Sequence, residues 1–233
     1  MRIGGLQKLT LIDYPGKLSC TVFTVGCNWR CGFCQNPELV IPDRFDAQPN
    51  LSKDDFFRFL NSKKGLLDGV CLTGGEPTIY KDLPEFIKEI KSFGFLVKLD
   101  TNGSNPKMIE YLLSKGFLDY IAMDVKASKE NYSKVVGVKV NLNNIQKSID
   151  LIKNSGIDYE FRVTVVPTII DENEIKEIGR WLFEVKLIAV QQFQNKKTLR
   201  REFKNIKPYS EEKLKKLSKI LESYAEKIEI RGI

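Results

Sequence analysis

The sequence of 233 residues contains no histidine. This absence excludes Ser-His and Cys-His nucleophilic sites and every metal site that needs an imidazole ligand. No apolar run is long enough to cross a bilayer, and residues 1–11 lack the apolar segment and the cleavage site of a secretory signal. We therefore expect a cytoplasmic protein.

Linkers and internal repeats are also missing, because no Gly-, Ser- or Pro-rich stretch divides the chain. A chain of this length can bury a substantial core as one unit. We expect a single domain over residues 1–233. It would consist of an N-terminal extension (1–17), a core (18–195) and a basic C-terminal segment with a helix and a terminal strand (196–233).

Positive charge is concentrated in one stretch of the chain. Residues 196–219 contain ten Lys or Arg and three Glu, a surplus equal to the net charge of +7 of the whole chain. A solvated helix face explains such a run without any ligand, whereas a basic patch can also attract an acidic protein, a membrane surface or nucleic acid. We expect no membrane or nucleic-acid partner, and docking of an acidic protein on this stretch is a hypothesis.

Short β-branched or aromatic runs alternate with longer runs of helical periodicity from Leu18 onward. The predicted strands cover residues 19–25, 69–73, 96–100, 120–124, 159–166 and 186–192. The predicted helices cover residues 53–62, 83–93, 106–115, 142–154, 172–183 and 211–226. Residues 2–17 resemble a short strand or hairpin at a sheet edge, with a turn at Tyr14-Pro15-Gly16.

This alternation predicts a parallel sheet with crossover helices, either doubly wound or closed into an incomplete barrel, and periodicity alone does not separate the two. In both folds the functional groups gather at the carboxyl ends of the strands. Cys27, residues 74–77, residues 101–103 and Lys126 each follow directly after a predicted strand. We therefore expect them to lie close together.

Three of the five cysteines, Cys27, Cys31 and Cys34, form a C-x3-C-x2-C loop after the first core strand. Three thiolates suit an iron-sulfur cluster with one iron free of protein ligands, because a cluster held entirely by protein normally takes four. A structural zinc site is the alternative. It would need Cys20, Cys71 or a carboxylate as fourth ligand, although both cysteines are more simply interpreted as small apolar strand residues.

At this loop the sequence resembles the radical S-adenosylmethionine (SAM) superfamily, whose hallmark is this spacing with an aromatic residue before the third cysteine, here Phe33. The resemblance implies a partial (β/α)6 TIM-like barrel and a [4Fe-4S] cluster on Cys27, Cys31 and Cys34, with SAM bound at the open iron. An electron from the reduced cluster would break the sulfonium C–S bond, releasing methionine and a 5′-deoxyadenosyl radical. Phe33 would lie against the adenine.

Residues 73–77 read Thr-Gly-Gly-Glu-Pro and follow the second core strand. Two glycines permit positive φ and close approach of the backbone to a ligand, but Gly-Gly is also an ordinary turn. The segment resembles the GGEP motif of the superfamily. That resemblance implies that Gly74, Gly75 and Glu76 accept hydrogen bonds from the methionyl ammonium group.

Two further strand ends carry acidic residues, Asp100-Thr101-Asn102-Gly103 and Asp124-Val125-Lys126. Asn-Gly is a turn signal, and an Asp-x-Lys pair is compatible with a surface ion pair. Both stretches are similar to the LDTNG and D-x-K segments of glycyl-radical activating enzymes. The resemblance implies a monovalent-cation site on Asp100, Thr101 and Asp124, and a SAM contact through Asp124 and Lys126.

Arg162 lies inside an otherwise apolar strand, and a buried guanidinium needs an anion or carbonyl partner. A structural salt bridge satisfies this requirement. The resemblance instead favours the methionyl carboxylate of SAM, which a planar guanidinium can bind through two hydrogen bonds.

Residues 5–17 and 35–39 most resemble the anaerobic ribonucleoside-triphosphate reductase activating proteins, which generate a radical on one glycine of a large partner enzyme. That resemblance implies a glycyl radical enzyme as protein substrate, and a flavodoxin or ferredoxin is the expected low-potential electron donor. Relatives commonly carry histidine where Gln35 stands, and some carry another near residues 191–194. Glutamine cannot act as an acid at neutral pH.

Three alternatives remain open. A pyruvate formate-lyase activating enzyme uses the same chemistry on another partner. A small-molecule radical enzyme such as 7-carboxy-7-deazaguanine synthase has the same cysteine spacing. A non-catalytic electron carrier or zinc-stabilised interaction domain would need neither the GGEP segment nor Arg162.

Overall fold

The computed structural model describes residues 1–41 and 51–233. Its strands are β1 (Ile3–Thr10), β2 (Ser19–Thr24), β3 (Gly69–Gly74), β4 (Leu96–Thr101), β5 (Tyr120–Asp124), β6 (Asp158–Val165), β7 (Val185–Gln192) and β8 (Ala225–Arg231). Its α-helices are α1 (Pro37–Val40), α2 (Lys53–Asn61), α3 (Leu83–Ser92), α4 (Pro106–Ser114), α5 (Tyr132–Val136), α6 (Leu142–Lys153), α7 (Glu172–Trp181) and α8 (Glu211–Leu221). Two 3₁₀ turns are η2 (Pro77–Ile79) and η3 (Arg201–Asn205).

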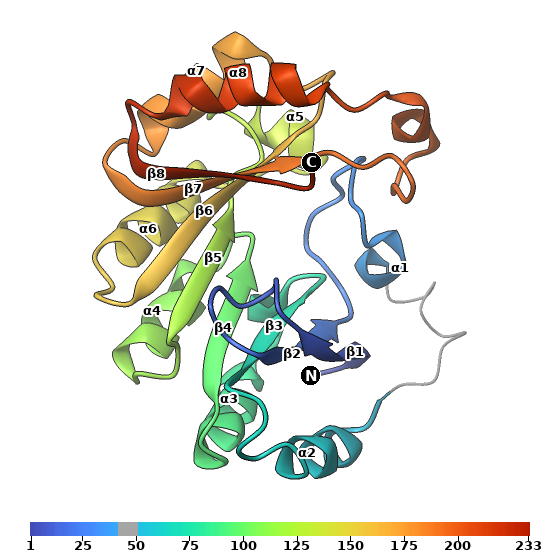
Figure 1. Cartoon of the computed structure of the whole chain (residues 1–233), viewed down its shortest axis with the longest axis vertical. Coiled ribbons are helices and arrows are strands. Elements are labelled where there is room, and N and C mark those ends of the chain that lie inside the picture. Colours follow the sequence, from blue (N-terminus) through green and yellow to red (C-terminus); the bar gives the residue numbers. More distant parts are fainter. Residues whose placement is uncertain (42–50) are drawn as a thin grey trace.

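The eight strands of the described residues form one sheet in the order β1 to β8. Strand β1 runs antiparallel to β2, and every later pair is parallel. Figure 1 shows the sheet as an open arc with the long helices along its outer face. A doubly wound sheet reverses its strand order at a switch point. Because the described strands show no reversal, the fold is a partial barrel, as the resemblance implied.

The predicted elements agree closely with the observed ones. Strands β2 to β7 lie within one residue of the predicted ranges at each end, and the helices predicted between residues 53 and 183 are α2, α3, α4, α6 and α7. Helix α2 begins where Ser52 accepts a hydrogen bond from the Asp55 amide at 3.0 Å, which is a side-chain N-cap.

The predicted helix over 211–226 is too long. Helix α8 ends at Leu221, and residues 225–231 form β8, which pairs in parallel with β7. The residues of this stretch favour helix individually, but Ile228 and Ile230 alternate with charged residues at the strand period. The open edge of β7 supplies backbone partners for β8, and this tertiary pairing overrides local preference. The short helices α1 and α5 were not predicted.

The N-terminal extension closes one end of the barrel. Strand β1 extends the edge of the sheet as expected, and the predicted turn is present, with the Lys17 amide donating to the Tyr14 carbonyl at 3.1 Å. Tyr14 is 3% exposed, and its ring lies 5.9 Å from that of Tyr120. Because both rings lie toward the amino ends of the parallel strands, they form a floor beneath the interior.

The two faces of the sheet bury different chemistry. In β6, Phe161 and Val163 pack into the main apolar core, whereas Glu160 and Arg162 alternate with them on the inner face. Glu160 is fully buried, and Arg231 of β8 binds both of its carboxylate oxygens, at 2.9 and 2.6 Å. The Tyr120 hydroxyl donates to the same carboxylate at 3.1 Å. The interior of the barrel is therefore lined by paired charges.

None of the helices described is both long enough and apolar enough to cross a membrane.

Candidate active site

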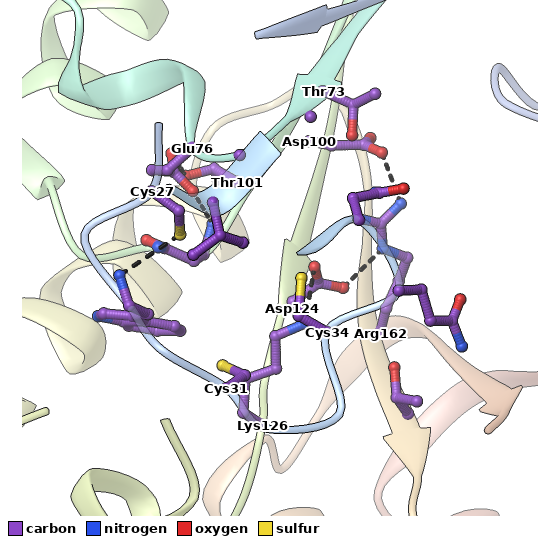
Figure 2. A pocket seen from close by; sticks show the side chains of 18 of the residues that line it. Cys27, Cys31, Cys34, Thr73, Glu76, Asp100, Thr101, Asp124, Lys126 and Arg162 are labelled. Carbon is purple, nitrogen blue, oxygen red and sulfur yellow. Dashed lines mark hydrogen bonds and ion pairs between the residues drawn. The ribbon is translucent and has the colours of Figure 1, made fainter. Parts of the chain in front are cut away.

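One cavity of about 340 Å³ opens at the carboxyl ends of the parallel strands, within the size range of small-molecule sites. All twelve residues that the sequence singled out line it: Cys27, Cys31, Phe33, Cys34, Gly74, Gly75, Glu76, Asp100, Thr101, Asp124, Lys126 and Arg162. Figure 2 shows the labelled side chains around this space. Their convergence follows from the parallel sheet, and their individual roles remain predictions.

The loop carrying Cys27, Cys31 and Cys34 follows β2 and is held by the backbone on several sides. The Gly26 amide donates to the Leu39 carbonyl at 2.6 Å, and the Arg30 amide donates to the Val136 carbonyl at 2.8 Å. These contacts tie the loop to α1 and to α5. The backbone on both sides of Cys27 is therefore held by neighbouring elements.

Burial raises the pKa of the Cys27 thiol to about 12 and that of Cys31 to about 11, and it also raises the pKa of Cys34. In the metal-free protein these groups are thus neutral at pH 7. Iron binding must displace their protons, because only the thiolate is a good ligand.

The donor set bears on the choice between a cluster and a single zinc ion. The loop supplies three thiols, and a zinc ion in a structural site normally takes four protein ligands. Three thiols suit a cluster that keeps one iron free of protein ligands.

The two glycines of the turn after β3 lie directly against the base of the cysteine loop. Gly74 has φ of +116°, and a Cβ there would lie 2.3 Å from the Thr24 amide nitrogen. A Cβ on Gly75 would lie 2.0 Å from the carbonyl oxygen of Gly26, the residue before Cys27. The Glu76 amide donates to the same carbonyl at 2.9 Å. Only glycine fits this contact between the two loops.

Gly75→Ala is therefore expected to displace the cysteine loop and to reduce the iron and sulfide bound after anaerobic reconstitution. Overpacking of this kind also lowers the free energy of unfolding by about 1–3 kcal/mol. Gly116→Ala is the matched control, because Gly116 has φ of +63° and no atom lies within 4 Å of the place that an added methyl group would take. The control should lose stability but bind iron normally, and equal iron binding by both variants would contradict the prediction.

Glu76 connects the ends of two strands. Its buried carboxylate accepts hydrogen bonds from the Thr78 hydroxyl at 2.5 Å, the Thr101 hydroxyl at 2.7 Å and the Asn102 amide at 2.6 Å. Burial raises the pKa of this carboxyl group, and the hydrogen bonds oppose the rise. Oε2 accepts only the Asn102 bond among the described residues, so it retains acceptor capacity toward the cavity.

A line of alternating charges crosses the cavity wall. The Arg162 guanidinium binds Asp100 at 2.7 Å and Asp124 at 2.9 Å, as Figure 2 shows. Lys126 binds the other oxygen of Asp124 at 3.1 Å, and Lys98 binds the other oxygen of Asp100. Burial alone would raise the pKa of both carboxyl groups. Arg162, together with Lys98 at Asp100 and Lys126 at Asp124, outweighs that effect, so both pKa values lie below the ordinary aspartate value.

Lys98 is the member of this line that sequence reasoning missed. It is 1% exposed, and its ammonium group lies 5.7 Å from the Tyr120 ring centre. Burial alone would lower its pKa, but Asp100 raises it above the usual lysine value. The sequence contained a signal for it. A lysine within the apolar strand Leu-Val-Lys-Leu is a cation that must be buried, and like Arg162 it therefore needs an anionic partner.

The residues predicted to bind a monovalent cation already have partners in this arrangement. Each carboxylate oxygen of Asp100 and Asp124 already faces Lys98, Arg162 or Lys126. The third proposed ligand, the Thr101 hydroxyl, donates to Glu76. A monovalent cation at these residues would therefore share the two carboxylates with three neighbouring positive charges. The cation site stays a prediction.

Phe33 lies where the cavity meets the C-terminal part of the chain. It is 4% exposed, its ring centre lies 6.1 Å from that of Phe203, and the Lys126 ammonium lies 6.0 Å from it. Gln35 and Gln191 also line the cavity, and each contributes a side-chain amide group to its wall.

Comparison with known sequences defines the class. The sequence model of the radical SAM superfamily matches residues 21–182, which include the cysteine loop, most of β2 and the whole of β3 to β6. The chain belongs to the radical SAM superfamily. Membership implies a [4Fe-4S] cluster and SAM, which agrees with the cysteine loop and cavity described above.

Relatives narrow this assignment. A Methanocaldococcus jannaschii protein provisionally named a glycyl-radical enzyme activating enzyme is 34% identical over 99% of this chain and 96% of its own length. The pyruvate formate-lyase-activating enzyme of Clostridium pasteurianum is 26% identical over 97% of this chain and 98% of its own length. This chain is accordingly an enzyme of the glycyl-radical enzyme activating type.

A solved structure supports the fold. A domain of a pyruvate-formate lyase-activating enzyme from Bacteroides vulgatus superposes with a TM-score of 0.58, at 21% identity. The match covers 70% of this chain and 99% of that domain. At this level of identity the likeness concerns the architecture alone.

Proposed function

We propose that this protein cleaves SAM reductively and uses the resulting radical to form a glycyl radical on a large partner enzyme, the anaerobic ribonucleoside-triphosphate reductase. The observation that carries the proposal is the convergence of three thiols and the predicted SAM contacts on one cavity. Similarity to a named activating enzyme over nearly the whole chain supports it.

A bound, reduced cluster would supply the electron that cleaves SAM to methionine and a 5′-deoxyadenosyl radical, which would take a hydrogen atom from the substrate. Cys27, Cys31 and Cys34 would hold the cluster. Because this loop offers three thiols, it would leave one iron for SAM. The buried walls of the cavity keep water from a reactive species.

The chain's own side chains would orient SAM. Arg162 uses Nη1 and Nε for its two aspartates, and Nη2 has no acceptor among the described residues. We assign Nη2 and Lys126 to the methionyl carboxylate. The free acceptor position of Glu76 Oε2 suits the methionyl ammonium group, and Phe33 offers an apolar face for the adenine.

The choice of partner rests on local sequence. Residues 5–17 and 35–39 resemble reductase activating proteins, whereas the Clostridium relative acts on pyruvate formate-lyase by name. Activation of pyruvate formate-lyase is therefore the second candidate. In both cases the peptide loop carrying the target glycine would enter the cavity at the carboxyl ends of the strands.

The test is anaerobic activation of each purified partner with SAM and dithionite. We expect an organic radical signal in electron paramagnetic resonance on the reductase, one methionine released per radical, and no signal when the target glycine is replaced by alanine. A signal only on pyruvate formate-lyase would shift the assignment to the second candidate. Absence of methionine and deoxyadenosine with both partners would refute radical SAM activity itself.

A further inference from the structure

The segment over residues 196–207 lies against the cysteine loop. The Arg200 amide donates to the Gly32 carbonyl at 3.0 Å, between the second and third cysteines. The Phe203 ring packs on that of Phe33, and a Cβ added to Gly32 would lie 2.3 Å from the Phe203 ring. Figure 1 shows this segment, with η3, on the same side of the molecule as the cysteine loop and α1. Residues 196–207 therefore contact the loop that carries the predicted cluster ligands.

This segment carries an unbalanced positive charge. Glu202 is its only acidic residue. Its basic residues are all exposed: Lys196, Lys197, Arg200, Arg201, Lys204 and Lys207. Lys197 pairs with Glu38 at 3.3 Å, and Arg200 approaches Glu202 at 3.8 Å. The other four, Lys196, Arg201, Lys204 and Lys207, have no carboxylate partner in the part of the chain that the structure describes. We call these four residues the basic cover.

The lysines of α8 differ from the basic cover, although both belong to the same basic run. Lys213 and Lys216 pair with Glu172 of α7 at 2.6 and 3.0 Å, and Lys215 pairs with Glu211 at 2.6 Å. Helix α8 packs on α7 at the outer face of the sheet (Figure 1). Its charges are largely compensated and do not contact the cysteine loop.

We propose that the basic cover is the docking surface for an acidic one-electron carrier protein. The inference rests on the proposed function, because each SAM cleavage consumes one electron that must come from outside the chain. The carrier gives up one electron and leaves oxidised by one electron, and no bond or proton is exchanged at the docking site. Opposite charges speed the encounter, and the cover places the carrier beside Gly32 on the cluster loop.

Four substitutions test this assignment against a control of equal charge. Lys196→Gln, Arg201→Gln, Lys204→Gln and Lys207→Gln remove the basic cover. Lys213→Gln, Lys215→Gln, Lys216→Gln and Lys219→Gln remove four charges from α8. The probe is a purified acidic flavodoxin. Its dissociation constant is measured by titration with the cluster-free protein, and its hydroquinone is then used to reduce the reconstituted enzyme.

At low ionic strength we expect the cover variant to bind flavodoxin about tenfold more weakly and to be reduced by it about tenfold more slowly. Its reduction rate should also depend less steeply on salt concentration than that of the unchanged protein. The α8 variant should stay within about twofold of the unchanged protein, because distant compensated charges contribute little. Dithionite-driven SAM cleavage should be the same in all three proteins.

Equal losses in both variants would indicate a general effect of net charge and overturn the docking site. Unchanged flavodoxin binding by the cover variant would also overturn the docking site. A loss confined to activation of the glycyl-radical partner would show that the surface binds that partner instead. Failure of dithionite-driven cleavage in the unchanged protein would instead refute the proposed function. The flavodoxin dissociation constants would still test the docking surface.

Discussion

Replacing Cys31 with serine is expected to abolish cluster assembly and SAM cleavage together. Cys31 is 8% exposed and lies between the other two predicted ligands on a loop whose backbone is held by neighbouring elements. A serine hydroxyl does not ionise near pH 7, so the cluster would lose one of its three proposed protein ligands. Loss of a direct ligand should exceed the roughly 10–100-fold effect typical of groups that only orient ligands.

The measurements are iron and sulfide content, the visible absorption of the cluster and the yield of deoxyadenosine after anaerobic reconstitution. Cys20→Ala is the control, because Cys20 is a fully buried residue of β2 that packs in the apolar core. This variant should keep the cluster and the activity. Loss of the cluster in Cys20→Ala, or tight binding of one zinc by the unchanged protein, would show that the ligand set is wrong.

Replacing Arg162 with methionine is expected to lower the free energy of unfolding by about 3 kcal/mol, since it leaves two buried carboxylates without their shared cation. Asp100 and Asp124 would each retain one lysine, Lys98 and Lys126. Urea unfolding of the cluster-free protein measures the loss.

Arg180→Met is the control for that substitution. Arg180 pairs with Glu177 on the exposed face of α7. An exposed pair of this kind contributes at most about 1 kcal/mol, so the control should be almost as stable as the unchanged protein. A similar loss in both variants would mean that the buried network does not stabilise the fold.

The effect of Arg162→Met should depend on pH in a defined direction. Arg162 holds the pKa values of Asp100 and Asp124 below the ordinary value of 3.8, so its contribution is present above that pH and is lost as the pH falls and the carboxylates become protonated. The difference in unfolding free energy between the two proteins should therefore narrow below about pH 4. A constant difference would assign the effect to packing.

Much of this fold follows from local patterns. The strand at 120–124 was predicted with its observed ends because an apolar run is bounded by a turn and an aspartate. The predicted end of the last helix was wrong, because residues 222–226 individually favour helix. The strand that begins at Ala225 forms only through pairing with β7. Periodicity did not separate a doubly wound sheet from a partial barrel, since that distinction depends on which strands become neighbours.

The candidate site shows the same division between local and long-range information. Motif spacing, together with the rule that functional groups gather at the carboxyl ends of parallel strands, identified twelve residues that line one cavity. Neither revealed that Arg162 holds Asp100 and Asp124 together, because the three residues belong to three different strands. Lys98 was overlooked although its burial was predictable. The contact of residues 196–207 with the cysteine loop has no local sequence signal, because it joins segments more than 150 residues apart.

The ion pair between Glu160 and Arg231 has a consequence for folding during synthesis. Strands β1 to β7 can be added to the sheet in the order in which the ribosome makes them. Before β8 emerges, however, the buried Glu160 carboxylate lacks the two hydrogen bonds that Arg231 donates and keeps the one from Tyr120. A nascent chain stalled at that point should therefore pack less tightly around β6 until β8 is translated.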